Sequence, residues 1–361
     1  MPAEYILEQF IIGPRLQLSI SEGRYKELAH ARSLLSEALA FEQRYELLLG
    51  NFLTMELAFT EICLRAKVEP QHRYMNSAEI LETANRHIVN LLTAMRAYAD
   101  QVVQDFKCLE LVPSFSQVAK SELNEAFSRS LDYRFMCSLR NHVQHKATAV
   151  HGFVANDDGM RDANGWAETV KFYANKVSLS ADRDFKPRVL DEQPQKIDIR
   201  RRARRSVEAV GKVHLALRKL SKDEVARARS AIELAICEYE EAGAESIIGL
   251  GARLVGDTSA DIALLLDWDD VRLRLVNKNS SLPRLWPRRT HREAKVEEII
   301  SLREAMEQTP AQAAALVFVT EDRWRDYEDG LPMPEGLFLL YKLQVGRHPT
   351  HTLQRSNTVD E

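Results

Sequence analysis

Long runs of helical periodicity constrain this chain more than any other feature of its sequence. Between residues 77 and 106 the apolar side chains recur at steps of three and four, the spacing of one helix face. Between 116 and 147 they repeat every four residues, at Leu123, Phe127, Leu131, Phe135, Leu139 and Val143. Similar patterns predict helices at about 24–66, 197–220 and 222–242. Amphipathic helices bury their apolar stripes against one another, so the sequence predicts a helical bundle.

Strand-like residues interrupt the helical pattern once, after the 116–147 ladder. Two such segments, 150–155 and 167–179, flank the turn-rich sequence NDDGMRDANG. Strand residues on both sides of a turn are typical of a β-hairpin. We therefore predict a small β-hairpin insertion at about 150–180.

The sequence changes in character from Asp261 onward. VRLRLV at 271–276 alternates apolar and basic residues, which predicts an edge strand. A helix is expected at about 293–307, and short apolar runs at 314–319 and 336–345 are strand candidates.

These patterns predict a mainly α protein in three parts. Residues 1–260 form a helical domain that carries the β insertion. Residues 261–350 form a small α+β region, and the polar residues 351–361 are expected to be a disordered tail.

Composition restricts the function classes. The formal net charge is −4, so any contact with a polyanion must come from a local basic patch. The four cysteines form no Cys-x-x-Cys pair, which argues against a structural zinc module and a disulfide framework. The first residues lack a basic region, and no stretch approaches the roughly 18 apolar residues of a membrane span. We expect a cytoplasmic protein with no membrane contact.

The four-residue ladder carries a polar cluster on its opposite side. At about 100° per residue, Arg140, Asn141, Gln144 and His145 fall within one sector of the helix, away from the apolar stripe. His142 leans back toward the packed side. The first four side chains are therefore the candidates for chemistry.

The sequence SLRNHVQHK (138–146) is similar to the Arg-x4-6-His motif of the HEPN superfamily (higher eukaryotes and prokaryotes nucleotide-binding), in its Arg-Asn-x3-His form. The resemblance covers roughly the first 220–260 residues. It implies a helical bundle whose motif helices pair in a homodimer, and metal-independent RNA cleavage without a cofactor. It also implies that Arg140 binds the scissile phosphate, that His145 transfers a proton, and that Asn141 orients both.

These residue types suit RNA cleavage. RNA carries its own nucleophile, the 2′-hydroxyl, so the enzyme needs a group that titrates near neutral pH, such as histidine. Arginine provides forked donors for the charge that develops on phosphorus. The expected products are a 2′,3′-cyclic phosphate and a 5′-hydroxyl.

The resemblance further implies a toxin or anti-phage defence effector that cuts tRNA or other RNA, with an antitoxin or regulatory partner as a further expectation. Ala147 stands where some HEPN toxins carry a tyrosine that a nucleotidyltransferase antitoxin modifies, so that mode of control is not expected. Two alternatives without catalysis stay open: an inactive HEPN-like binding or scaffold module, and an unrelated all-α interaction protein.

A basic segment follows the insertion. Residues 183–219 contain twelve Lys or Arg and five Asp or Glu, a net charge of +7. One interpretation is a patch that follows RNA phosphates, and the other is a solvated helix paired with acidic surface elsewhere. The candidate RNA contacts are Arg200, Arg201, Arg204 and Arg205, with Gln144 and Lys146 from the motif helix.

Three other patterns have simpler interpretations. His142, His145 and His151 have a spacing that permits metal binding, but no carboxylate or cysteine accompanies them, and no metal is expected. The acidic LDWDDV (266–271) is interpreted as a turn before a strand. IGLGARLVG (248–256) lacks the third glycine of GxGxxG and is interpreted as a loop.

Overall fold

The computed structural model describes residues 4–12, 15–68, 74–109, 113–145, 148–155, 170–182, 185–283, 294–329, 331, 333–348 and 351. It divides the chain into two compact units, one spanning Met1–Met160 and Ala167–Leu285, the other built on Trp286–Glu361. The described residues are mainly helical with short antiparallel strands, which confirms the predicted fold class.

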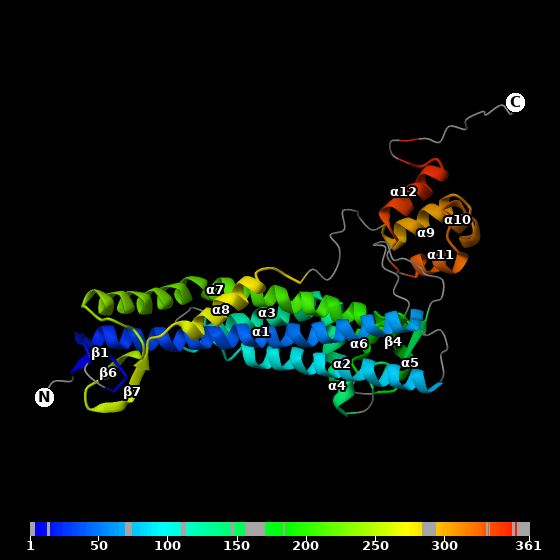
Figure 1. Ribbon diagram of the computed structural model, residues 1–361. Helices are drawn as coiled ribbons and strands as arrows, with labels where there is room; N and C mark the ends of the chain where they lie inside the picture. Colours follow the sequence, from blue (N-terminus) through cyan, green and yellow to red (C-terminus); the bar gives the residue numbers. More distant parts are fainter. Residues whose placement is uncertain are drawn as a thin grey trace. The chain divides into compact units, whose positions relative to one another are not determined.

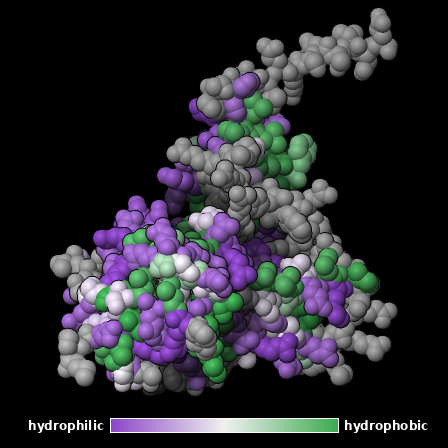
Figure 2. Space-filling view, turned by 60° about the vertical axis from the view of Figure 1, so that its left-hand side comes forward, coloured by the Kyte–Doolittle hydropathy of each residue, from purple (hydrophilic) through white to green (hydrophobic). Residues whose placement is uncertain are grey.

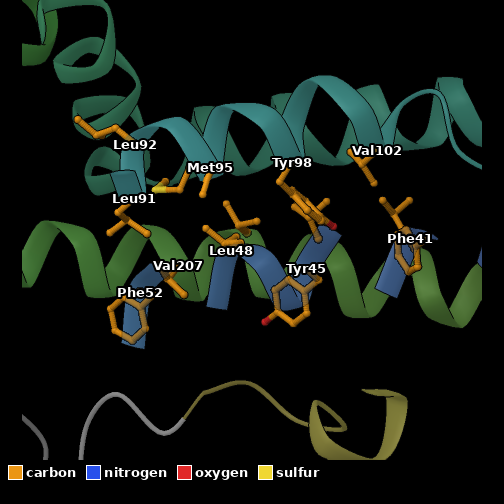
Figure 3. Close-up of a cluster of buried hydrophobic side chains, with 14 of the residues drawn as sticks. Phe41, Tyr45, Leu48, Phe52, Leu91, Leu92, Met95, Tyr98, Val102 and Val207 are labelled. Carbon is orange, nitrogen blue, oxygen red and sulfur yellow. The ribbon is translucent and has the colours of Figure 1, made fainter. Parts of the chain in front are cut away.

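Three long helices form the centre of the first unit. They are α1 (Glu22–Val68), α2 (Tyr74–Val102) and α7 (Ile199–Glu241), and α2 and α7 both pack along α1 (Figure 1). Buried apolar and aromatic side chains fill the space between them (Figure 3). Those labelled in the figure are Phe41, Tyr45, Leu48 and Phe52 of α1, Leu91, Leu92, Met95, Tyr98 and Val102 of α2, and Val207 of α7.

The predicted helix at 116–147 is in fact two helices, α3 (Phe115–Arg129) and α4 (Leu131–His145). Ser130 separates them in an extended conformation, with φ −108° and ψ 107°. Its backbone N–H donates to the carbonyl of Ala126, and its Oγ accepts from the backbone N–H of Tyr133. One serine therefore serves both helix ends. Serine is a preferred N-cap, but the usual markers of a helix C-terminus are Gly and Pro, so the sequence does not mark the end of α3.

The two helices predicted at 197–220 and 222–242 are instead one continuous helix, α7. Ser221, the residue between the two predicted ranges, is buried, and its Oγ donates to the carbonyl of Leu217 within the same helix. A serine inside a helix can satisfy its hydroxyl in this way. The apolar stripe continues past it through Val225 and Ile232, so packing on α1 sustains the helix.

The predicted β-hairpin insertion is confirmed. Strands β3 (Gly152–Ala155) and β4 (Val170–Asn175) pair antiparallel, with Phe153 opposite Phe172. A third strand, β5 (Lys196–Asp198), extends the sheet beyond β4 and leads directly into α7. Between β4 and β5 lie two short helices, α5 (Lys176–Ser180) and α6 (Pro187–Asp191).

A second, four-stranded sheet was not expected from the sequence. Its strands are β1 (Tyr5–Gln9), β2 (Gln17–Ile20), β6 (Leu250–Leu254) and β7 (Asp257–Ala263), in the order β2-β1-β6-β7. The prediction that 248–256 is a loop is therefore wrong. Gly251 is needed for packing, since a Cβ there would meet the Phe10 ring and would lie 2.8 Å from the backbone oxygen of Ile262. The pairing of chain segments about 245 residues apart is invisible to local periodicity.

The first unit extends further along the chain than predicted. Residues 271–276 form helix α8 (Asp267–Lys278) rather than an edge strand, and the acidic residues before them open that helix. Arg229 of α7 binds Asp269 at 2.7 Å, and the Arg32 guanidinium lies 3.7 Å from the centroid of the Trp268 ring. These contacts hold α8 on the bundle, so the division falls at Leu285 instead of residue 260.

The described part of the second unit holds four helices: α9 (Val296–Ala305), α10 (Pro310–Leu316), α11 (Glu321–Glu328) and α12 (Glu335–Gln344). The helix expected at 293–307 is confirmed. The strands expected at 314–319 and 336–345 are wrong, because a short apolar run does not distinguish a strand from a buried helix. Trp324 is fully buried at the centre and meets the Tyr341 ring edge-on at 4.7 Å. The tail lies outside the described residues, except for His351.

Helix α1 is long and apolar enough to cross a membrane by length and composition alone. In this structure, however, many of its side chains belong to the bundle core, among them Leu35, Leu48 and Phe59. Apolar residues are interspersed with hydrophilic ones on the face seen in Figure 2, as is common on protein surfaces.

Candidate functional site

The motif lies on the last two turns of α4. The apolar side of this helix is fully buried through Phe135, Met136 and Leu139. Asn141 and Gln144 are exposed on its other side, as the helical wheel predicts. His145 is the last residue of α4, and its side chain lies outside the described part of the structure, as does all of Lys146.

Arg140 is half-buried and only partly satisfied. Its Nη1 donates to the Oδ1 of Asn141 at 3.3 Å. Its Nε is buried and has no hydrogen-bond partner among the described residues. A buried guanidinium N–H without an acceptor is costly, so Arg140 is well placed to accept an anionic partner.

A pocket of about 560 Å³ lies beside Arg140, between α2, α3, α4 and the start of α6. Apolar side chains line it from α2, α3 and α4, and polar and charged side chains accompany them. The charged and amide residues of the lining are Arg96, Asp100, Lys120, Asn124, Arg140, Asn141 and Lys186. The motif arginine thus borders a concave site and not a flat helix face.

The pKa of the Cys137 thiol depends on the charges around this pocket. Burial raises the pKa of its thiol to about 11, so the sulfur stays protonated near neutral pH. The hydrogen bond with Tyr133 and the positive charges of Arg96, Lys186 and Arg140 each act to lower that pKa. Three cations from three different elements are therefore close enough to act on one atom.

His142 belongs to the packing of α4 and not to its exposed face, as the wheel predicts. It is buried, and its Nδ1 lies 2.6 Å from the Oδ2 of Asp182, just after α5. Its Nε2 is buried without a hydrogen-bond partner in the described chain. The ring of His151 lies 6.4 Å away, centroid to centroid, and the Nδ1 of His151 accepts from the backbone N–H of Asn175. The His142–Asp182 pair ties the motif helix to the β insertion.

The arginines proposed as RNA contacts on α7 divide into two groups. Arg200 and Arg204 both bind the carboxylate of Glu56 on α1, each at 2.7 Å, and Arg200 also donates to Thr60. Both arginines therefore form internal ion pairs between α7 and α1.

The remaining two arginines of that group, Arg201 and Arg205, are half-buried. Arg205 binds Glu208 at 3.3 Å on the same helix. Burial lowers the pKa of Arg201, and the neighbouring Arg202 adds to the effect. The structure therefore does not gather these arginines into the pocket beside Arg140.

Sequence reasoning missed three cations of the pocket, Arg96, Lys120 and Lys186. They come from three separate elements, and nothing in their local sequence distinguishes them from other surface cations. Only the packing of α2 and α3 against α4 brings them to Arg140.

Within the described residues, no group of three or more His, Cys, Asp or Glu side chains is arranged to hold a metal ion. Comparison with models of known families, with curated proteins and with solved structures finds no match for this chain.

Proposed function

We propose that this chain is a metal-independent endoribonuclease of the HEPN type that acts in the cytoplasm as a homodimer. Its role would be that of a toxin or anti-phage defence effector that cuts tRNA or other RNA. The observation that carries the proposal is Arg140, a half-buried guanidinium with an unsatisfied Nε beside Asn141 on the helix that ends at His145.

The proposed chemistry divides between these side chains. Arg140 binds the scissile phosphate through its forked donors and neutralises the charge that develops in the transition state. His145 moves the proton of the 2′-hydroxyl or of the leaving oxygen, the general acid–base role for which histidine is the most common side chain. Asn141 accepts from Arg140 and fixes its orientation. A second copy of the motif helix would complete the cleft.

The test is cleavage of total tRNA and of a structured RNA in EDTA by the full chain and by His145→Ala. His30→Ala is the matched control, since His30 is exposed on α1, away from the motif. We expect EDTA-resistant cleavage with 2′,3′-cyclic phosphate ends in the wild type and in His30→Ala, and its loss in His145→Ala. Equal cleavage by all three proteins, or none by a well-folded wild type, contradicts the proposal.

An exposed apolar stripe on α1 favours a second candidate, a non-catalytic interaction module. Leu53, Leu57, Leu64 and Val68 are all exposed and recur at steps of four and seven, on one face of the helix. A contiguous exposed apolar face marks an interaction surface more often than a free one. Loss of self-association in Leu57→Glu, with no RNA cleavage by the wild type, would favour this candidate.

A further inference from the structure

The pocket beside Arg140 has two chemically different parts. Its apolar part comes from α2, the residue that follows α2, α3 and α4: Leu92, Met95, Val103, Leu123, Phe127 and Met136. Its polar part contains four cations and a single carboxylate, that of Asp100. The Asp100 carboxylate binds Arg96 at 2.7 Å. Three positive charges, those of Lys120, Arg140 and Lys186, then remain without a carboxylate among the residues that line the pocket.

The three residues that carry these charges belong to different parts of the fold. Lys120 comes from α3, Arg140 from α4, and Lys186 from the residue that precedes α6. The Nζ of Lys186 lies 5.3 Å from the centre of the Phe127 ring. Like charges gathered beside an apolar interior repel one another, and an anion that enters the pocket relieves this repulsion.

We propose that this pocket binds a nucleoside monophosphate, either free or as one unit of an RNA chain. The phosphate lies against Lys120, Arg140 and Lys186, and the base enters the apolar part beside Phe127. The inference deepens the proposed function. Binding of the nucleotide as one unit of an RNA chain rests on that function, whereas binding of a free nucleotide does not. A volume of about 560 Å³ lies within the usual range for small-ligand sites.

Two features favour a nucleotide over an acyl carboxylate. Three cations suit a phosphate dianion better than a single carboxylate charge. The lining also includes Asn124 and Asn141, whose amides carry both donors and acceptors and can bind the edge of a base, for which an acyl chain has no use. An aromatic ring at the apolar end offers a surface on which a base stacks.

The first experiment titrates the four nucleoside 3′-monophosphates into the full chain by calorimetry, with inorganic phosphate and decanoate as comparison ligands. The variant is Lys120→Ala, and the matched control is Lys107→Ala, an exposed lysine outside the pocket lining. We expect saturable nucleotide binding, weaker binding of phosphate alone, and roughly a tenfold loss in Lys120→Ala, the usual effect of removing one charge-assisted contact. Lys107→Ala should bind like the wild type.

A second readout does not depend on any variant. Cys137 lines the pocket, whereas Cys237 is exposed and outside it. A bound nucleotide should slow alkylation of Cys137 at alkaline pH and leave that of Cys237 unchanged. A third experiment uses RNA as the substrate. It compares which bases are preferred at the cleavage site by the wild type and by Leu123→Trp, whose larger side chain fills the pocket.

The outcomes separate this inference from the ribonuclease. Nucleotide binding with Cys137 protection supports the pocket even where no RNA is cut, a result that contradicts only the ribonuclease. RNA cleavage without binding of any mononucleotide, and with unchanged base preference in Leu123→Trp, contradicts the pocket alone. Tighter binding of decanoate than of every nucleotide also overturns the inference.

Discussion

Arg200 and Arg204 on α7 and Arg140 on α4 are all predicted from the sequence to contact RNA, but their surroundings differ in the structure. On α7, Arg200 and Arg204 share the carboxylate of Glu56, so their charges are balanced within the bundle. On α4, Arg140 contacts only the neutral amide of Asn141 in the described hydrogen bonds, and its Nε has no partner there. Arg200 and Arg204 hold helices together, and Arg140 is available to a ligand. A run of basic residues therefore does not locate a binding site until its acidic partners are known.

The largest expected effect is on stability, from Glu56→Gln. This change leaves two largely buried guanidinium groups without their carboxylate, and should lower the free energy of unfolding by about 3–5 kcal/mol. Urea denaturation measures the loss. The control is Glu61→Gln on the same helix, whose exposed pair with Arg65 should change stability by less than about 0.5 kcal/mol. Similar losses of unfolding free energy in Glu56→Gln and Glu61→Gln would show that the buried ion pairs of Arg200 and Arg204 contribute no more to stability than an exposed pair.

The second prediction concerns RNA cleavage, for which Arg140→Ala should have a large effect, and stability, for which its effect should be small. Under the proposed function, Arg140→Ala should reduce RNA cleavage roughly a hundredfold or more, as the loss of one preorganised charge-stabilising donor usually does. Its unfolding free energy should fall by less than that of Arg204→Ala, because Arg140 has no carboxylate partner among the described residues. Arg129→Ala, an exposed arginine on α3, is the activity control. Equal cleavage by Arg140→Ala and Arg129→Ala contradicts the assignment of Arg140.

A third polar cluster extends the comparison to pH. His214 on α7 is fully buried, stacked between Phe41 and Tyr45, and its Nε2 lies 3.2 Å from Glu42. Burial lowers the pKa of His214. Burial alone would raise the pKa of Glu42, but its hydrogen bonds with His214 and Arg218 outweigh burial and lower it.

Both shifts have the same sign for stability. The unfolded chain binds more protons than the folded one below the ordinary histidine pKa of about 6.5, and again near that of glutamate. We expect these two groups together to lower the unfolding free energy as pH decreases from 7 to 4. His214→Gln should reduce the slope between pH 6.5 and 5, measured by urea denaturation at each pH. An unchanged slope would show that His214 does not contribute.

The smallest effect concerns the carboxylate inside the pocket. Asp100→Asn removes the charge that binds Arg96, and both side chains are about half exposed. We expect less than about 0.5 kcal/mol change in stability. Under the nucleotide inference, affinity for a nucleoside monophosphate should rise about two- to threefold, because a fourth cation becomes available. A loss of affinity in calorimetry would indicate that Asp100 positions Arg96 for the ligand.

The sequence by itself determined the helices with long amphipathic stripes, the β-hairpin, and the exposure of Asn141 and Gln144 opposite the buried Leu139. These features follow from local periodicity, since side chains three or four residues apart share one helix face wherever the helix packs. The burial of His142 followed from the same wheel.

Only the tertiary structure decided which charges are paired and which line the pocket. Glu56 lies 144 residues from Arg200, and Lys120 and Lys186 reach the pocket of Arg140 through the packing of separate elements. The sheet that pairs β1 with β6, and the continuity of α7 through Ser221, were likewise set by contacts between distant segments. Such contacts depend on how the helices and strands pack, and the spacing of residues along one segment carries no information about them.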